Sequence, residues 1–227
     1  MLQQVPISLN EQLIQIIRNS SSLMAALRAV RDLSLTSWAI GAGAVRNTVW
    51  DHLHGFVKRT PTQDVDVVFF DRENLSRERE QELQCKLTEV VTDVRWDVTN
   101  QAAVHLWYEK EFGQTVAPLT SLEEGISTWP EYATCIGVRL HADDQLEVIA
   151  PHGLEDLFSM LIQWNPTLVT SDAYIQRVRQ KAFSNCWPQV RTLLPFDESS
   201  RPNLYRVPRP TPVCTNTPIS HSAVSSR

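Results

Sequence analysis

The sequence predicts an α+β fold in which helices flank a small mixed β-sheet, followed by a helical C-terminal part and a disordered tail. Three observations predict this fold. In the first hundred residues, short apolar runs rich in β-branched and aromatic side chains alternate with segments of helical periodicity. Two further apolar runs, 135–140 and 146–150, flank a polar Asp-Asp-Gln turn and indicate a hairpin. Beyond about residue 195, prolines, serines and threonines dominate and the periodicity ends.

The length and composition suit one domain with an appendage. Of 227 residues, 42% are apolar and 21% are charged, which is usual for a globular protein. The seven tryptophans and seven phenylalanines can fill a substantial core. We therefore assign one domain to residues 1–194. Residues 195–227 are predicted to be a disordered tail, because they cannot bury enough apolar surface to offset the entropy of ordering.

Charge, cysteine content and hydropathy exclude several classes of protein. A net charge of −5 argues against a broad basic face, so we expect neither a DNA-binding protein nor a polymerase of long RNA. The four cysteines are far apart and form no C-x-x-C pair, which indicates reduced thiols. No secretory signal and no apolar run of membrane-spanning length is visible. The expectation is a cytoplasmic protein without a membrane partner.

The N-terminal elements follow from caps and periodicity. Ser8-Leu9-Asn10-Glu11 fits a capping box, and apolar residues at helical spacing extend one helix to about residue 31. A short strand at 35–40 then ends in Gly41-Ala42-Gly43, and a helix at 44–53 follows it. After a polar loop, the run at 65–70 is typical of a strand.

The remaining elements are predicted in the same way. Periodic leucines and valines predict a helix at 75–91, and a short strand follows at 94–98. Helices are expected at 154–161 and 172–183, with Ser171 as the cap of the second.

The glycine turn after the first strand is a candidate phosphate-binding site. Gly41 and Gly43 allow a tight turn and a close approach of a ligand to the backbone. The following helix directs its free N–H groups and its positive dipole end toward an anion, and Arg46 could add a bidentate phosphate contact. The alternative is a purely structural turn with a surface arginine.

Asp64 and Asp66 form the second candidate site. Residues i and i+2 of a strand point to the same face, so both carboxylates project side by side while Val65 and Val67 enter the core. Carboxylates this close repel each other unless a cation lies between them, and Mg²⁺ prefers such oxygen ligands. The alternative is a solvated acidic end of the strand.

Asp97, between Trp96 and Val98, is a third acidic strand residue. A lone aspartate on a strand is usually a surface residue, but a metal site on Asp64 and Asp66 would need a third acidic ligand from a neighbouring strand.

Together these residues resemble the DNA polymerase beta-type nucleotidyltransferases, whose pattern is a glycine turn, then Asp-x-Asp, then a lone acidic residue on a neighbouring strand. More closely, the chain is similar to one uncharacterised nucleotidyltransferase-like family. The resemblance covers roughly residues 10–192, and the turn reads Gly-Ala-Gly where many relatives have Gly-Gly or Gly-Ser. It is carried by the stretches GAGAVRN from Gly41, DVDVVFFD from Asp64, WDVTNQAAVH from Trp96, WPEYAT from Trp129, IAPHGLEDLF from Ile149 and NPTLV from Asn165.

The resemblance implies a nucleotidyltransferase-type sheet topology and a metal-dependent transfer reaction. By it, Asp64 and Asp66 bind two Mg²⁺ ions, with Mn²⁺ as an alternative. Asp97 binds the catalytic ion and helps to deprotonate a hydroxyl acceptor. Gly41 and Gly43 hold the β- and γ-phosphates of a nucleoside triphosphate, with Arg46 as a further phosphate ligand. A nucleoside monophosphate moves to the acceptor and pyrophosphate leaves.

Several alternatives stay open at this point. A DxD glycosyltransferase also uses paired aspartates, although only 63 residues precede Asp64. A catalytically silent member of the fold would bind a nucleotide or a protein, as in a toxin–antitoxin pair. The acceptor could be a small molecule, a protein hydroxyl or an RNA end. Asn100, Gln101 and His105 could line the same cleft, and Glu131 is interpreted as a helix cap.

Overall fold

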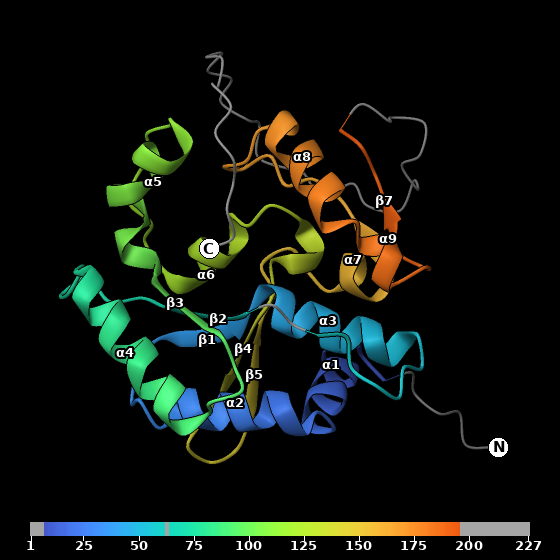
Figure 1. Ribbon diagram of the computed structural model, residues 1–227, viewed down its shortest axis with the longest axis horizontal. Coiled ribbons are helices and arrows are strands. Elements are labelled where there is room, and N and C mark those ends of the chain that lie inside the picture. Colours follow the sequence, from blue (N-terminus) through green and yellow to red (C-terminus); the bar gives the residue numbers. More distant parts are fainter. Residues whose placement is uncertain (1–6, 62–63, 196–227) are drawn as a thin grey trace.

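The architecture is known from a computed structural model, which describes residues 7–61 and 64–195. A five-stranded sheet forms its centre, with the spatial order β3-β2-β1-β4-β5 (Figure 1). The strands are β1 (Trp38–Gly41), β2 (Val65–Phe69), β3 (Trp96–Asn100), β4 (Gly137–Leu140) and β5 (Leu146–Ile149). A second, two-stranded sheet joins β6 (Leu161–Ile162) to β7 (Arg191–Thr192) in parallel.

The main sheet is mixed, as the sequence predicts. Strand β1 pairs antiparallel with β2 on one side and with β4 on the other, and β4 and β5 form the expected hairpin. Strands β2 and β3 run parallel, with helix α4 as the connection between them. In their register Asp66 lies opposite Asp97, so the two aspartates are direct neighbours across the pair.

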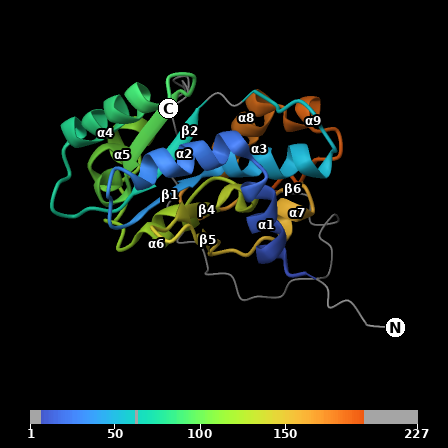
Figure 2. The ribbon, with the colours of Figure 1, turned by 90° about the horizontal axis from the view of Figure 1, so that it is seen from below.

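Helices cover both faces of the sheet. Figure 2 shows α2, α3 and α4 along one face. The helices are α1 (Leu9–Arg18), α2 (Ser21–Arg31), α3 (Ala42–Leu53), α4 (Arg77–Val90), α5 (Val104–Phe112), α6 (Leu122–Ser127), α7 (Glu155–Phe158), α8 (Ser171–Lys181) and α9 (Phe183–Cys186), with 3-10 turns η1 (Gln101–Ala103) and η2 (Tyr132–Thr134).

The alternation along the strands divides the core into two parts. Val67, Phe69 and Val98 face the larger core, which the apolar sides of α1 to α4 complete. On the opposite face Val68 packs with α6 through Ile126. The aspartates of β2 and β3 lie on this second face, toward the amino ends of their strands.

Three predicted elements differ from the structure. The expected single helix to residue 31 is two helices, because Ser20 caps α2 by accepting a hydrogen bond from the Leu23 N–H at 3.3 Å. The expected helix at 154–161 is only the single turn α7, and strand β6 begins within its range. The cap of α8 is Thr170 rather than Ser171, since the Thr170 hydroxyl accepts from Ala173 N–H.

The helical C-terminal part packs against α3 through aromatic side chains. The Trp50 indole donates to the Leu157 carbonyl at 2.9 Å, and its ring meets Phe183 and Trp187 edge-on. The Trp187 indole donates to Asp51 at 2.8 Å. These contacts fix α7 and α9 relative to α3.

Within residues 7–61 and 64–195, no helix combines the length and the apolar character that a membrane crossing requires. The tail predicted to be disordered, from residue 196 onward, lies outside the described residues.

Candidate active site

The three candidate aspartates come from the amino ends of two adjacent parallel strands. Asp64 directly precedes β2, Asp66 is its second residue, and Asp97 is the register partner of Asp66 on β3. Register partners on parallel strands point to the same face, and neighbouring strands lie about 4.8 Å apart. The sheet therefore holds the backbones of Asp66 and Asp97 side by side, and Asp64, two residues before Asp66, is close enough for its charge to act on Asp66.

Burial and the neighbouring carboxylates both disfavour the negative charge of Asp66. Burial, followed by the negative charges of Asp64 and Asp97, raises the pKa of Asp66 to about 7. Arg177 and Arg46 act in the opposite direction but do not cancel the effect. Asp66 is thus a partly buried carboxylate for which the surrounding protein supplies too little positive charge.

The side chains do not converge into a finished metal cage. Among the described residues, no group of three acidic, histidine or cysteine side chains lies close enough to hold a metal ion without adjustment. Repulsion between like charges is sufficient to keep the carboxylates apart when no cation lies between them. The donor chemistry nevertheless fits Mg²⁺, which takes oxygen ligands and is usually bound by only one or two carboxylates, substrate phosphates and water.

The glycine turn lies where β1 ends and α3 begins. A side chain at Gly41 would collide with the ring of Trp129, at 2.5 Å, and with the carbonyl oxygen of Ile136, at 2.8 Å. The residue with a left-handed backbone is Ala42, at φ +47°, an uncommon conformation for a residue with a Cβ. Gly41 caps α3 without a side-chain hydrogen bond, so the first N–H groups of the helix have no side-chain cap.

Gly43 and Gly41 therefore differ in their surroundings. The nearest group to a Cβ built on Gly43 is the Arg46 Nη2, at 3.8 Å, and no packing contact requires a glycine there. Gly41 is required by the packing of Trp129, whereas Gly43 leaves space in front of the first turn of α3.

Arg46 is buried rather than on the surface. It is 5% exposed, and its guanidinium lies over the rings of Phe183 and Trp50, with centroid distances of 4.7 and 5.3 Å. Its Nη2 donates to Asn47 Oδ1 at 2.9 Å, and its Nε is among the described buried polar atoms without a hydrogen-bond partner. Burial lowers the pKa of Arg46 to about 10, so it stays charged at neutral pH. Arg46 contributes positive potential from beneath the turn.

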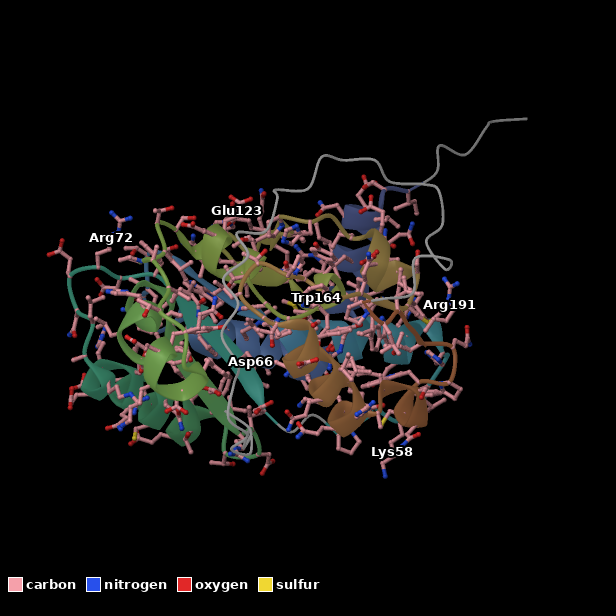
Figure 3. The ribbon with its side chains drawn as sticks, turned by 90° about the horizontal axis from the view of Figure 1, so that it is seen from above. Lys58, Asp66, Arg72, Glu123, Trp164 and Arg191 are labelled. Carbon is pink, nitrogen blue, oxygen red and sulfur yellow. The ribbon has the colours of Figure 1, made fainter. Side chains whose placement is uncertain are left out.

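Helix α8 brings two cations to the aspartates that sequence reasoning did not single out. Although burial works against its charge, Glu131 and then Asp66 and Asp64 raise the pKa of Arg177. The pKa of Lys181 is lowered by burial and by the positive charges of Arg177 and Arg46. In Figure 3, Asp66 is seen beside the ribbon of α8. The i, i+4 spacing of Arg177 and Lys181 places both on one helix face, which could have indicated a cationic site. The same spacing is also usual for a solvated helix surface.

The interpretation of Glu131 as a helix cap is only partly right. Glu131 occupies the cap position of η2, but its side chain makes no capping hydrogen bond. It is fully buried, and its Oε1 accepts a hydrogen bond from Arg177 Nε at 2.6 Å. Burial opposes its charge, but Arg177 and then Arg46 lower the pKa of Glu131.

The polar residues after Asp97 serve other parts of the fold. Asn100 is buried and points to the opposite face from Asp97, where its side chain bonds the backbone of Asp71 and Asn74. Gln101 is also buried, against Gly125 of α6. His105 lines a separate hollow of about 440 Å³ beyond the carboxyl ends of β2 and β3, and its Nδ1 is buried without a partner among the described atoms.

Comparison with known proteins gives a family and a fold. A family model described as "Nucleotidyltransferase" matches residues 28–192. A structure solved by NMR and described as a CCA-adding enzyme head domain is 29% identical, with a TM-score of 0.68 over 81% of this chain and 95% of that one.

Two more distant structures span longer chains. They are a CCA-adding enzyme in complex with CTP (11% identity, TM-score 0.49) and an apo tRNA-processing enzyme (15%, 0.45). Each match covers 84% of this chain but only 44% and 46% of theirs, and similarity at this level does not bear on function. No curated protein sequence matches the chain.

Proposed function

Since the chain belongs to the nucleotidyltransferase family whose model covers residues 28–192, we propose that it moves a nucleoside monophosphate from a metal-bound nucleoside triphosphate to a hydroxyl acceptor, with release of pyrophosphate. The observation that supports the metal-dependent part is the parallel register of β2 and β3, in which Asp97 lies opposite Asp66, together with the charge of Asp64 that acts on Asp66. The family match also favours nucleotidyl transfer over a DxD glycosyltransferase.

The aspartates would have unequal roles. Asp64 and Asp66 would each bind both Mg²⁺ ions, or Mn²⁺ in their place, and Asp97 would bind the catalytic ion. When bound, the ions supply Lewis-acid stabilisation of the attacking and leaving oxygens at the α-phosphate. By the resemblance described above, Asp97 would also help to deprotonate the acceptor hydroxyl.

The glycine turn would receive the rest of the phosphate chain. The Ala42 N–H donates to the Ile136 carbonyl, but the first turn of α3 has no side-chain cap, so its next N–H groups and the positive end of the helix dipole would face the β- and γ-phosphates. The open space in front of Gly43 allows a close approach, and the buried charge of Arg46 adds to the attraction.

The acceptor is a hydroxyl on a small molecule, a protein or an RNA end. The similarity to a CCA-adding enzyme head domain makes an RNA end the first of these to test.

The test incubates the protein with Mg²⁺, each labelled nucleoside triphosphate and a panel of these acceptors. We expect label transfer that EDTA abolishes and that Mg²⁺ restores. The variant Asp64→Ala/Asp66→Ala should reduce transfer to background. The matched control is Asp93→Ala, an exposed aspartate outside the site, which should retain full transfer.

Equal label transfer by wild type and the double variant would disprove the catalytic assignment. Binding of a triphosphate without transfer to any acceptor would favour a catalytically silent member of the family.

A further inference from the structure

Helix α8 is fixed in place by a buried tyrosine. Tyr174 is fully buried, and its hydroxyl lies 2.7 Å from the Leu193 carbonyl and 3.2 Å from that of Ile162. Arg177 and Lys181 follow three and seven residues later, which places them on the same side of the helix as Tyr174. Both cations are therefore carried by a helix whose rotation is set by packing.

Arg177 is held at its Nε by a buried carboxylate. The 2.6 Å bond from Arg177 Nε ends on Glu131, which is 0% exposed and whose Oε2 accepts from the Thr134 hydroxyl at 3.0 Å. The Arg177 side chain itself is 33% exposed. The bond to Glu131 uses Nε rather than the two terminal nitrogens, which are a pair that can bind a phosphate in a bidentate manner. An arginine fixed in this way loses little entropy when it binds an anion.

The environment of Arg177 distinguishes it from Arg46. The guanidinium of Arg46 is enclosed between two aromatic rings, whereas that of Arg177 is partly exposed and close enough to Asp66 and Asp64 to feel their charges. Lys181, which is exposed, is close enough to Arg177 and Arg46 for their charges to act on it. An anion bound at the aspartates would therefore be in direct contact with the cations of α8 rather than with Arg46.

The charge balance at the site calls for such a contact. Asp64, Asp66, Asp97 and Glu131 contribute up to four negative charges, with Asp66 partly protonated at neutral pH, against three positive charges on Arg46, Arg177 and Lys181. A triphosphate cannot approach the aspartates without cations placed opposite them, because like charges in a partly buried site repel strongly.

We propose that Arg177 binds the phosphate chain of the donor opposite the aspartates, and that Glu131 is the residue that positions it. This inference rests on the proposed function only in taking a nucleoside triphosphate as the ligand. Lys181, one turn further along α8, extends the same cationic face.

The test measures equilibrium binding of Mg²⁺–ATP and of inorganic tripolyphosphate to the full chain. The variant Arg177→Met should lower the affinity for both ligands by roughly ten- to a hundred-fold, which corresponds to the loss of one charge-assisted contact. Arg179→Met, an exposed arginine on the same helix, is the matched control and should change neither affinity by more than about twofold.

The role of Glu131 is tested by a double-mutant cycle. Glu131→Gln alone should lower the affinity for tripolyphosphate by roughly three- to ten-fold, because Arg177 loses its fixed position. In the Arg177→Met background the same change should have no further effect on binding, since Glu131 acts only through Arg177. A purely structural role would instead weaken binding equally in both backgrounds.

The double variant also guards against misfolding. Arg177→Met leaves Glu131 buried without its partner, whereas Glu131→Gln/Arg177→Met removes both charges. Tripolyphosphate affinity within twofold of wild type in the folded double variant would overturn the proposal. Weakened binding in a protein that transfers no nucleotide would retain this inference and reject the proposed function. If the variants bind tripolyphosphate as wild type does and still transfer nucleotide, this inference is rejected and the proposed function is retained.

Discussion

Replacing Asp66 by asparagine should stabilise the metal-free protein while it removes a metal ligand. The pKa of Asp66 is raised from the ordinary value of 3.8 to about 7, first by burial and then by Asp64 and Asp97. Between those two pH values the folded state retains a proton that the unfolded state has lost. The free energy of unfolding therefore falls as the pH rises from about 4 to about 7, and then levels off. Asparagine has nearly the same shape and does not ionise, so the variant escapes this loss.

The magnitude follows from the two pKa values. Their difference of about 3.2, at about 1.4 kcal/mol for each pKa unit, sets an upper bound of about 4 kcal/mol above pH 7. Solvent screening and relaxation of a partly exposed group reduce this to about 2–3 kcal/mol. For a chain of this size, the corresponding rise in Tm is roughly 5–10 °C.

The assay is thermal unfolding in EDTA at pH 8 and at pH 4, with Asp93→Asn as the control for an exposed aspartate. Asp66→Asn should be more stable than wild type at pH 8 and equal to it at pH 4. Adding Mg²⁺ at pH 8 should stabilise wild type and reduce the difference. A Tm of the variant at or below that of wild type at pH 8, or a gain of the same size at pH 4, would refute the reasoning.

Two further predictions concern the backbone around the site. Gly41→Ala should cost about 1–3 kcal/mol, because its methyl group would meet Trp129 at 2.5 Å, whereas Ala42→Gly should stabilise the fold by about 0.5–1 kcal/mol by relieving the left-handed backbone at φ +47°. Urea unfolding of both variants measures these opposite signs, and equal signs would contradict the assignment of strain. Asn100→Ala should cost about 2–4 kcal/mol, because buried backbone groups of Asp71 lose their partners, with little change in nucleotide affinity. Loss of nucleotide affinity without loss of stability would instead place Asn100 in the binding site.

The acidic side of the site follows from local sequence patterns to a large extent. The period of two along a strand is sufficient to put Asp66 on one face and Val67 on the other, and the structure has this arrangement. Asp64 directly precedes the strand, close enough for its charge to act on Asp66. Asp97 depended on the resemblance, because the register of two parallel strands depends on how α4 packs between them. That register is a tertiary property, and no spacing within either strand reveals it.

The break between α1 and α2 could have been predicted from a local capping residue, but the apolar periodicity suggested one continuous helix. Apolar residues continue at helical spacing through Asn19 and Ser20, but Ser20 offers its hydroxyl to the backbone and starts a new helix. At the glycine turn, phosphate binding by Gly41 and Gly43 stays a prediction. Gly41 is also required by the packing of Trp129, a contact that the sequence gives no means of anticipating.

The cationic side of the site depends on contacts between residues far apart in the chain. Arg177 lies 46 residues from Glu131, and its helix carries charges at a spacing that also suits a solvated surface. The packing of α8 through Tyr174 and the hydrogen bond from Arg177 to Glu131 together set the position of Arg177 near the aspartates.

The two sides of the site consequently have different physical origins, and substitutions in them should affect different kinetic constants. The aspartates are fixed by the sheet and would act on the reacting phosphate, so changes in β2 should lower kcat. Arg177 is fixed by a separate C-terminal helix and would contact the donor equally in the ground and transition states, so changes in α8 or at Glu131 should raise the KM for the nucleotide with little change in kcat. A variant of Arg177 that lowers kcat as strongly as a variant of Asp66 would mean that α8 contributes to the chemical step itself.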